Sequence, residues 1–132
     1  MRSRETLIRL QQFKVEEKQR DVDDIEVMIA DFTQKEQDLM QQVQMEEERA
    51  GVTDPKHFNY PTTATAIRDR RDNLLRSVGE LKNQMGDAKA AVEEQQSELR
   101  KLKLLIEKDD GMKASVSNES VVLPESTIVS TH

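Results

Sequence analysis

The chain has 132 residues, of which 35% are hydrophobic, 3% are aromatic and 35% are charged, with a net charge of −6 and no cysteine. This composition excludes a thick globular core, because such a core needs more large apolar side chains. The acidic balance argues against nucleic acid as the main partner, since binding to phosphates needs clustered Lys and Arg. The lack of cysteine excludes a disulfide framework and thiolate chemistry.

The sequence contains no apolar run long enough to span a bilayer, and no signal-peptide core follows Met1. We therefore expect a cytoplasmic protein, and contact with a membrane through a membrane-bound partner stays open. The abundance of Glu, Lys, Gln, Arg, Leu and Ala favours a helical structure with a thin apolar seam over a disordered chain.

Residues 4–50 contain no glycine and no proline, and they predict one long helix. With Ile8 at position a of a heptad, the middle of this stretch forms an apolar seam, while its two ends carry Gln, Lys and Glu. Gly51 suits the C′ position that ends such a helix. The predicted a positions are Ile8, Val15, Val22, Ile29, Glu36, Val43 and Ala50, and the d positions are Gln11, Lys18, Ile25, Phe32, Leu39 and Glu46.

Residues 51–61 contain Gly51, Pro55 and Pro61, and they predict a loop. Residues 62–110 contain no proline and predict a second helix, with Gly111 as the C′ residue that ends it. The second seam is clearer, although Arg71, Ala88 and Gln95 interrupt it. The predicted a positions are Ala64, Arg71, Val78, Met85, Val92, Leu99 and Ile106, and the d positions are Ile67, Leu74, Leu81, Ala88, Gln95 and Leu102.

The loop is too short for the two helices to run parallel. Each helix is about 70 Å long at a rise of ~1.5 Å per residue, whereas the loop spans at most about 40 Å. The helices therefore fold back antiparallel, or each pairs with another chain. In the hairpin, position i is expected to face residue roughly 112 − i. The opposite charges expected to meet are Glu46, Glu47 and Glu48 with Arg68, Arg70 and Arg71, and the basic N-terminal stretch with Glu93, Glu94, Glu98 and Glu107.

Residues 111–132 are rich in Ser, Thr and Val and have no helical period, which predicts a flexible, disordered C-terminal tail. The apolar segments 121–123 and 128–129 leave pairing as edge strands as the alternative. The predicted fold is thus all-α: a long two-helix antiparallel coiled-coil hairpin over residues 1–110, with a short proline-containing loop, followed by the tail.

The predicted hairpin has no concave interior in which catalytic groups converge. The only histidines are His57 and His132, and the sequence has neither ligands at metal-binding spacing nor a glycine-rich phosphate loop. We therefore predict no catalytic residue, no cofactor and no metal, and a function in binding other proteins.

Three aromatic or histidine side chains, His57, Phe58 and Tyr60, gather in the predicted loop. In one interpretation Phe58 and Tyr60 close the end of the seam. In the other, the loop is a tip that docks into a partner. The sequence alone leaves both interpretations open.

A second group of apolar residues lies outside the seam, at the open end of the hairpin. Leu7, Leu10 and Phe13 take positions g, c and f, and Leu104 and Leu105 take positions f and g. They are too many for a seam that is two positions wide. Either a local shift of the heptad buries some of them, or they form an interaction surface.

Three segments of the chain are distinctive. They are Ser3-Arg4-Glu5-Thr6-Leu7-Ile8-Arg9-Leu10 with Phe13 and Val15-Glu16-Glu17-Lys18, then Glu46-Glu47-Glu48-Arg49-Ala50-Gly51 with Asp54-Pro55, His57-Phe58 and Tyr60-Pro61, and finally Arg70-Arg71-Asp72-Asn73-Leu74. Together they resemble the FliJ family of flagellar export proteins over about residues 1–110. The loop segment is the most specific of the three, and the tail after Gly111 has no counterpart.

The resemblance implies an antiparallel coiled coil similar to the rotor stalk of F-type ATPases, acting in flagellar assembly and motility. It also implies three partners of the type III export apparatus: the export ATPase ring, the cytoplasmic domain of the export gate, and export chaperones. From the residues, we expect the ring to meet the open end, and the gate to meet the loop or the adjoining part of the second helix.

Two other functions remain open from the sequence. One is a generic cytoplasmic coiled-coil scaffold, and the other is a holdase chaperone of the prefoldin kind. The short loop leaves little room for the strands that prefoldin inserts between its helices. The oligomeric state also stays open between a monomer and a weak homo-oligomer, such as a four-helix bundle.

Overall fold

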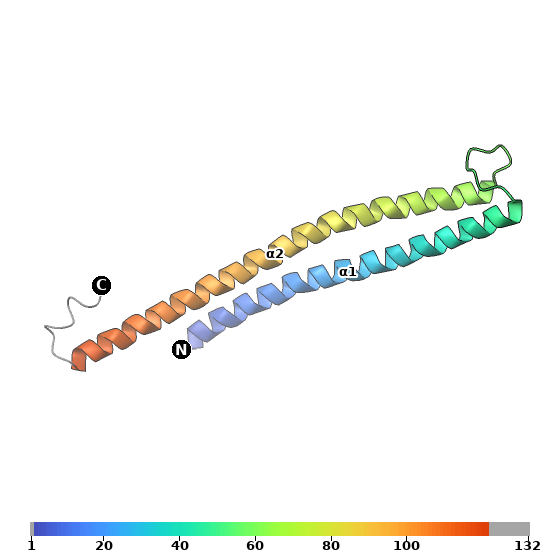
Figure 1. Ribbon diagram of the computed structural model, residues 1–132. Coiled ribbons are helices and arrows are strands. Elements are labelled where there is room, and N and C mark those ends of the chain that lie inside the picture. Colours follow the sequence, from blue (N-terminus) through green and yellow to red (C-terminus); the bar gives the residue numbers. More distant parts are fainter. Residues whose placement is uncertain (1, 122–132) are drawn as a thin grey trace. The chain divides into compact units, whose positions relative to one another are not determined.

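A computed structural model describes the chain from Arg2 to Val121. It contains two helices, α1 (Arg2–Ala50) and α2 (Thr62–Val121), and no strand within the described range. Figure 1 shows the helices running in opposite directions, joined by the loop of residues 51–61. The predicted two-helix antiparallel hairpin is therefore confirmed. Neither helix, over its described residues, combines the length and the apolar character that a membrane crossing requires.

The chain divides into two compact units. The loop unit is Lys18–Ala91, and the open-end unit is Met1–Glu17 together with Val92–His132. Each unit contains a stretch of α1 beside an antiparallel stretch of α2. Each is therefore held together by its own part of the seam.

The seam follows the predicted heptads. Every predicted a and d position is buried or half-buried, except Ala50, which lies exposed at the end of α1. Side chains that recur every 3.5 residues stay on one face of a helix, so they meet the partner helix along its length. The buried apolar residues are Val22, Leu39, Val43, Tyr60, Ala64, Val78, Leu81 and Val92.

Four of the polar interruptions in the seam bond to one another in two pairs. Gln11 Nε2 donates to the backbone oxygen and to Oε1 of Gln95, both at 2.9 Å. Arg71 Nε donates to Glu36 Oε1 at 2.6 Å. A polar group in a seam is tolerated when it finds a partner and is costly when the register slips, so these layers help to specify the pairing of the two helices.

The expected pairing of i with roughly 112 − i fits the contacts on average. Leu7 shares a groove with Leu105, and Arg4 pairs with Asp109, each within one position of the expected residue. Long polar side chains depart from it by about a turn in either direction. Glu36 and Gln11 bond to partners earlier in α2 than expected, and Glu47 bonds to one later.

The ion pairs agree with the expectation in part. Glu47 does pair with Arg68 as expected, with 3.0 Å between Oε2 and Nη2. Arg71, however, pairs with Glu36 and not with the acidic run near the loop. At the basic N-terminus, Arg4 pairs with two acidic residues that the register argument did not name, Asp109 and Asp110.

The two predicted helix ends have different outcomes. Gly51 has φ +70°, and its N–H donates to the carbonyl oxygen of Glu47 at 2.8 Å, so the predicted C′ glycine of α1 is confirmed. The predicted stop at Gly111 is wrong, because α2 continues through it to Val121. A glycine inside a helix costs about 1 kcal/mol but breaks no backbone hydrogen bond.

The final turns of α2 extend beyond the start of α1 in the open-end unit (Figure 1). The first ten residues after Gly111 in the predicted tail are therefore helical. The remainder, residues 122–132, lies outside the described range, and so does the segment 128–129.

We expect the Glu36–Arg71 layer to cost stability when it is broken and little when it is replaced as a pair. Arg71→Leu leaves Glu36 in the seam without its cation and should lower the free energy of unfolding by about 1–2 kcal/mol. Replacing both residues by Leu should recover that loss or exceed it, because no charge is then desolvated. Thermal melting followed by circular dichroism measures both variants.

The matched control is Arg76→Leu, since Arg76 is exposed on α2 and bonds to nearby Asn73 on the same helix. It should change the melting midpoint little. A double variant no more stable than Arg71→Leu alone would contradict this account of the layer.

Candidate protein-binding surfaces

The loop is anchored by three side chains that bond to one another. The Tyr60 hydroxyl donates to Glu47 Oε2 at 2.8 Å and accepts from Arg68 Nε at 2.8 Å. Arg68 Nη2 also donates to Glu47 Oε2 at 3.0 Å. The Arg68 guanidinium lies 6.0 Å from the centre of the Tyr60 ring. This triad joins the end of α1, the loop and the first turns of α2.

The triad shifts the titration of each member. The bonds from Tyr60 and then Arg68 hold the pKa of Glu47 below its ordinary value, against the opposing effect of burial. Burial raises the pKa of Tyr60, and the bonds to Tyr60 and Glu47 raise the pKa of Arg68. The carboxyl is thus held as an anion and the phenol as a neutral group. Since the hairpin is two helices thick, water lies near the triad and weakens these effects.

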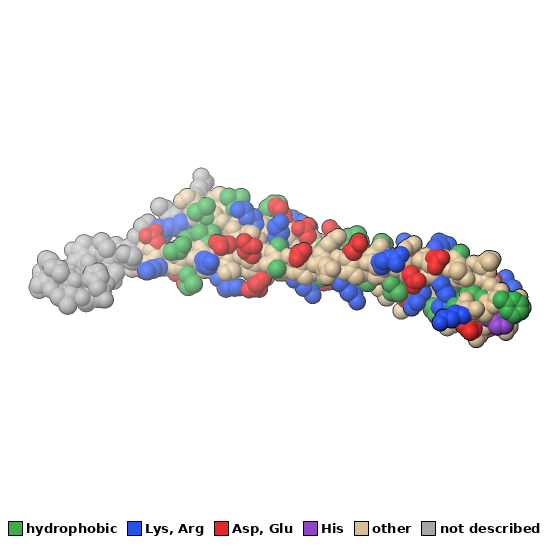
Figure 2. All heavy atoms as spheres, turned by 90° about the horizontal axis from the view of Figure 1, so that it is seen from above, with side chains coloured by type: hydrophobic (Ala, Val, Ile, Leu, Met, Phe, Trp, Pro, Cys, Tyr) green, Lys and Arg blue, Asp and Glu red, His purple; other side chains and the backbone are tan. Residues whose placement is uncertain are grey.

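Two other loop side chains point away from the anchor. Phe58 is 88% exposed, and its ring stacks on His57 with the ring centres 4.7 Å apart and the planes at 22°. His57 Nδ1 accepts the Asn59 N–H at 3.0 Å, and the His57 carbonyl accepts the Tyr60 N–H at 3.0 Å. Figure 2 shows hydrophobic atoms beside the histidine at this end of the molecule. We call His57 and Phe58 the tip pair.

The three predicted loop residues therefore differ in burial. Tyr60 closes the end of the seam, as one interpretation expected, and its hydroxyl is fully engaged. The expectation that Phe58 closes the seam as well is wrong, because Tyr60 already fills the place next to Glu47. Of the three, His57 and Phe58 are exposed to solvent.

The five apolar residues predicted at the open end are all exposed, with fractions between 50% and 65%. The local heptad shift that would bury some of them is therefore absent. Positions g, c and f lie on one side of the seam, so all five share that side of the open-end unit. We call them the open-end apolar face: Leu7, Leu10, Phe13, Leu104 and Leu105.

A groove brings the two helices' contributions to this face together. Leu7 of α1 and Leu105 of α2 line an open groove of about 540 Å³, together with Ile106. Arg4, Lys108 and Asp109 form its charged rim. Figure 2 shows hydrophobic side chains among charged ones in this part of the molecule. The arrangement is an apolar strip with a polar border, as protein interfaces have.

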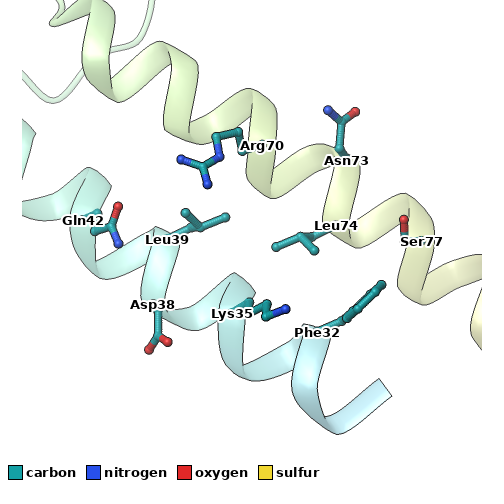
Figure 3. A pocket seen from close by; sticks show the side chains of 9 residues that line it. All are labelled: Phe32, Lys35, Asp38, Leu39, Gln42, Arg70, Asn73, Leu74 and Ser77. Carbon is teal, nitrogen blue, oxygen red and sulfur yellow. The ribbon is translucent and has the colours of Figure 1, made fainter. Parts of the chain in front are cut away.

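A second groove, of about 540 Å³, lies in the loop unit and was not predicted. Its floor is made by Phe32, Leu39 and Leu74, and Figure 3 shows Leu39 and Leu74 pointing toward each other from the two helices. The sequence carried a signal for this groove, because the g positions beside this part of the seam hold polar residues that do not cover its apolar side chains. These g residues are Lys35, Gln42, Arg70 and Ser77. The lining residues at the rim are Lys35, Asp38, Gln42, Arg70, Asn73 and Ser77.

The fold and these surfaces define a two-helix coiled-coil hairpin with an exposed aromatic tip and an exposed apolar face. Comparisons with protein-family models, with curated proteins and with solved structures gave no match to this chain. Within the described part of the chain, no three His, Cys, Asp or Glu side chains are grouped so as to hold a metal ion.

We expect Tyr60→Phe to loosen the loop. The change removes the hydroxyl that bonds to both Glu47 and Arg68, and a lost hydrogen bond costs about 1 kcal/mol. Urea unfolding should show a lower midpoint, and hydrogen exchange should be faster at the Tyr60 amide. Phe58→Ala, at an exposed position, is the control and should change neither. Equal stability of Tyr60→Phe and the wild type would show that the triad is not an anchor.

We expect Glu47 to make the hairpin acid-sensitive. Its pKa in the folded protein lies below the ordinary value of 4.5. Its contribution to stability is therefore complete above that value and is lost as the pH falls through the lowered pKa. Glu47→Gln should show a smaller loss of stability than the wild type between neutral pH and about pH 3. Glu48→Gln, at an exposed neighbour, should behave like the wild type, and an equal effect of both variants would contradict the assignment.

Proposed function

We propose that this chain is a non-enzymatic, protein-binding component of a flagellar type III export apparatus that acts in the cytoplasm. The observation that carries the proposal is the open-end apolar face, since five large side chains exposed together on a charged hairpin usually mark a binding site. The resemblance of the loop and helix segments to the FliJ family supports the export apparatus as the setting.

The open-end apolar face is the surface that we assign to the ring of the export ATPase. It combines an apolar strip with a rim that carries both signs of charge. Such a surface gains binding free energy from the apolar centre and orientation from the rim. The chain would then act as a stalk or adaptor, and it would reach the inner membrane through its partners.

The tip pair is the surface that we assign to the export gate. Phe58 is the most exposed large apolar side chain among those described, and the Tyr60–Glu47–Arg68 triad holds the loop that carries it. A preorganised aromatic side chain loses little conformational entropy when it enters a pocket. Export chaperones are the third class of partner in this proposal.

The alternative of a generic scaffold shares the same surfaces and differs only in the partner. The alternative of a prefoldin-like holdase is less well supported, because that fold uses strands between its helices and residues 2–121 contain none. The export role is therefore preferred.

We expect the double change Leu7→Asp/Phe13→Asp to abolish binding to the export ATPase from the same cell. Both side chains lie outside the seam, so helicity should be unchanged, whereas two charges in the apolar face should weaken binding by more than about tenfold. Association is measured by titration calorimetry, and ATP turnover is measured with and without the chain.

Two controls separate this surface from the rest of the molecule. Val27→Asp makes the same kind of change at an exposed position of α1 in the loop unit, and Phe58→Ser alters the tip. Both variants should bind the ATPase as the wild type does. No association at micromolar concentrations would refute the ATPase role and favour the scaffold.

A further inference from the structure

The open-end apolar face has a spacing that suits a second copy of itself. Leu7, Leu10 and Phe13 are three residues apart on α1, so a two-fold axis at Leu10 exchanges positions 7 and 13. We propose that this face pairs with the same face of a second copy, in an antiparallel arrangement centred on Leu10. The proposal goes beyond the export role and does not depend on it.

The groove gives this pairing a specific fit. Six residues of helix separate Leu7 from Phe13, or about 9 Å along the axis. The symmetric arrangement therefore places Phe13 of each copy over Leu7 of the other, where the groove opens. The groove has a volume of about 540 Å³, and its apolar wall is formed by Leu7, Leu105 and Ile106, so a phenyl ring finds both space and apolar contact. Each copy supplies one ring and one groove.

One of the charges that follow Phe13 is opposite in sign to a cation at the groove. The rim carries Arg4 and Lys108, and Arg4 is already paired with Asp109 and Asp110, which leaves Lys108 as the cation at the end of the groove. Glu17 lies one turn beyond Phe13 and is exposed. The two-fold axis brings position 17 of one copy to position 3 of the other, beside this rim, so Glu17 and Lys108 attract each other across the interface.

The exposed apolar area is also large enough for the centre of a dimer interface. Five side chains that are at least half exposed present a few hundred Å² of apolar surface. A standard interface buries about 800 Å² per partner, of which somewhat more than half is apolar. The apolar face therefore supplies most of the apolar centre of a standard interface, and the charged rim supplies the rest. Such a dimer covers the same five residues as the ATPase site, so pairing and ATPase binding exclude each other.

The first experiment is sedimentation velocity of the full chain over a series of concentrations. The expected result is a monomer–dimer equilibrium in the micromolar range, with no larger species. Leu10→Asp places two like charges at the axis and should leave only monomer. Val27→Asp, at an exposed position of α1 in the loop unit, is the matched control and should dimerise as the wild type does.

A disulfide tests the position of the axis, because the chain contains no cysteine. In helices that cross at about 8–10 Å, residues that face each other at the axis have Cα atoms roughly 3.5–5.5 Å apart, a range that overlaps that of disulfides. Leu10→Cys should therefore form a covalent dimer on mild oxidation much faster than Val27→Cys. Equal rates would overturn the proposed axis.

Charge reversal tests the rim. Glu17→Lys alone and Lys108→Glu alone should each weaken the dimer several-fold, and the two changes together should restore it. Failure of the double variant to recover would refute the proposed contact, and a wild type that stays monomeric at every concentration would refute the dimer. A monomer that binds the ATPase and loses that binding with Leu7→Asp/Phe13→Asp would refute only the dimer and leave the export role standing.

Discussion

A hairpin of two helices has one seam, and the seam admits only two side chains per heptad from each helix. Every other position faces water. This constraint explains why about a third of the residues are charged and why only eight apolar residues are buried among those whose side chains are described. It also explains why the polar layers matter. Because the apolar area is small, the Gln11–Gln95 and Glu36–Arg71 contacts do much to distinguish the native pairing from a slipped one.

The same constraint sets what the sequence could predict. A period of 3.5 residues survives the loss of single apolar residues, so the a and d positions could be assigned even through Arg71 and Gln95. The loop bounds followed from Gly51 and Pro61, since glycine at C′ and proline each leave a clear local signal. These features depend on residues that are neighbours in the chain, and all of them were predicted correctly.

Most of the errors concern contacts between residues that are distant in the chain. The heptads set the facing residues only to within about a turn, so they do not show that Arg71 bonds to Glu36 rather than to the acidic run near the loop. No local pattern predicts the bonds that join Tyr60 to Glu47 and Arg68. Phe58 and Tyr60 are both aromatic loop residues, yet Phe58 is exposed and Tyr60 is buried. Tyr60 alone of the two has a hydroxyl, and this hydroxyl bonds to Glu47 and Arg68. The predicted helix end at Gly111 was wrong for a local reason, since glycine permits a helix end without requiring one.

The exposed apolar surfaces are formed by residues that lie outside the a and d positions of the seam. The five residues of the open-end apolar face lie at g, c and f, so a two-stranded seam leaves them exposed. The prediction named all five correctly as surplus, because counting apolar residues against seam positions needs no knowledge of the register. The groove in the loop unit was missed for the opposite reason. It depends on which g residues of the two helices come together, and counting apolar residues against seam positions does not address that.

The triad at the loop also bears on how the hairpin assembles. Glu47 and Tyr60 are separated by 13 residues, whereas Gln11 and Gln95 are separated by 84. Closing a short segment loses less chain entropy, so the contacts beside the loop form first and the helices then zip together toward the termini. Transient opening of the native protein runs in reverse and begins at the termini. A molecule bound there holds shut the segment that separates first, and so slows unfolding of the whole chain more than an equally tight molecule bound at the loop.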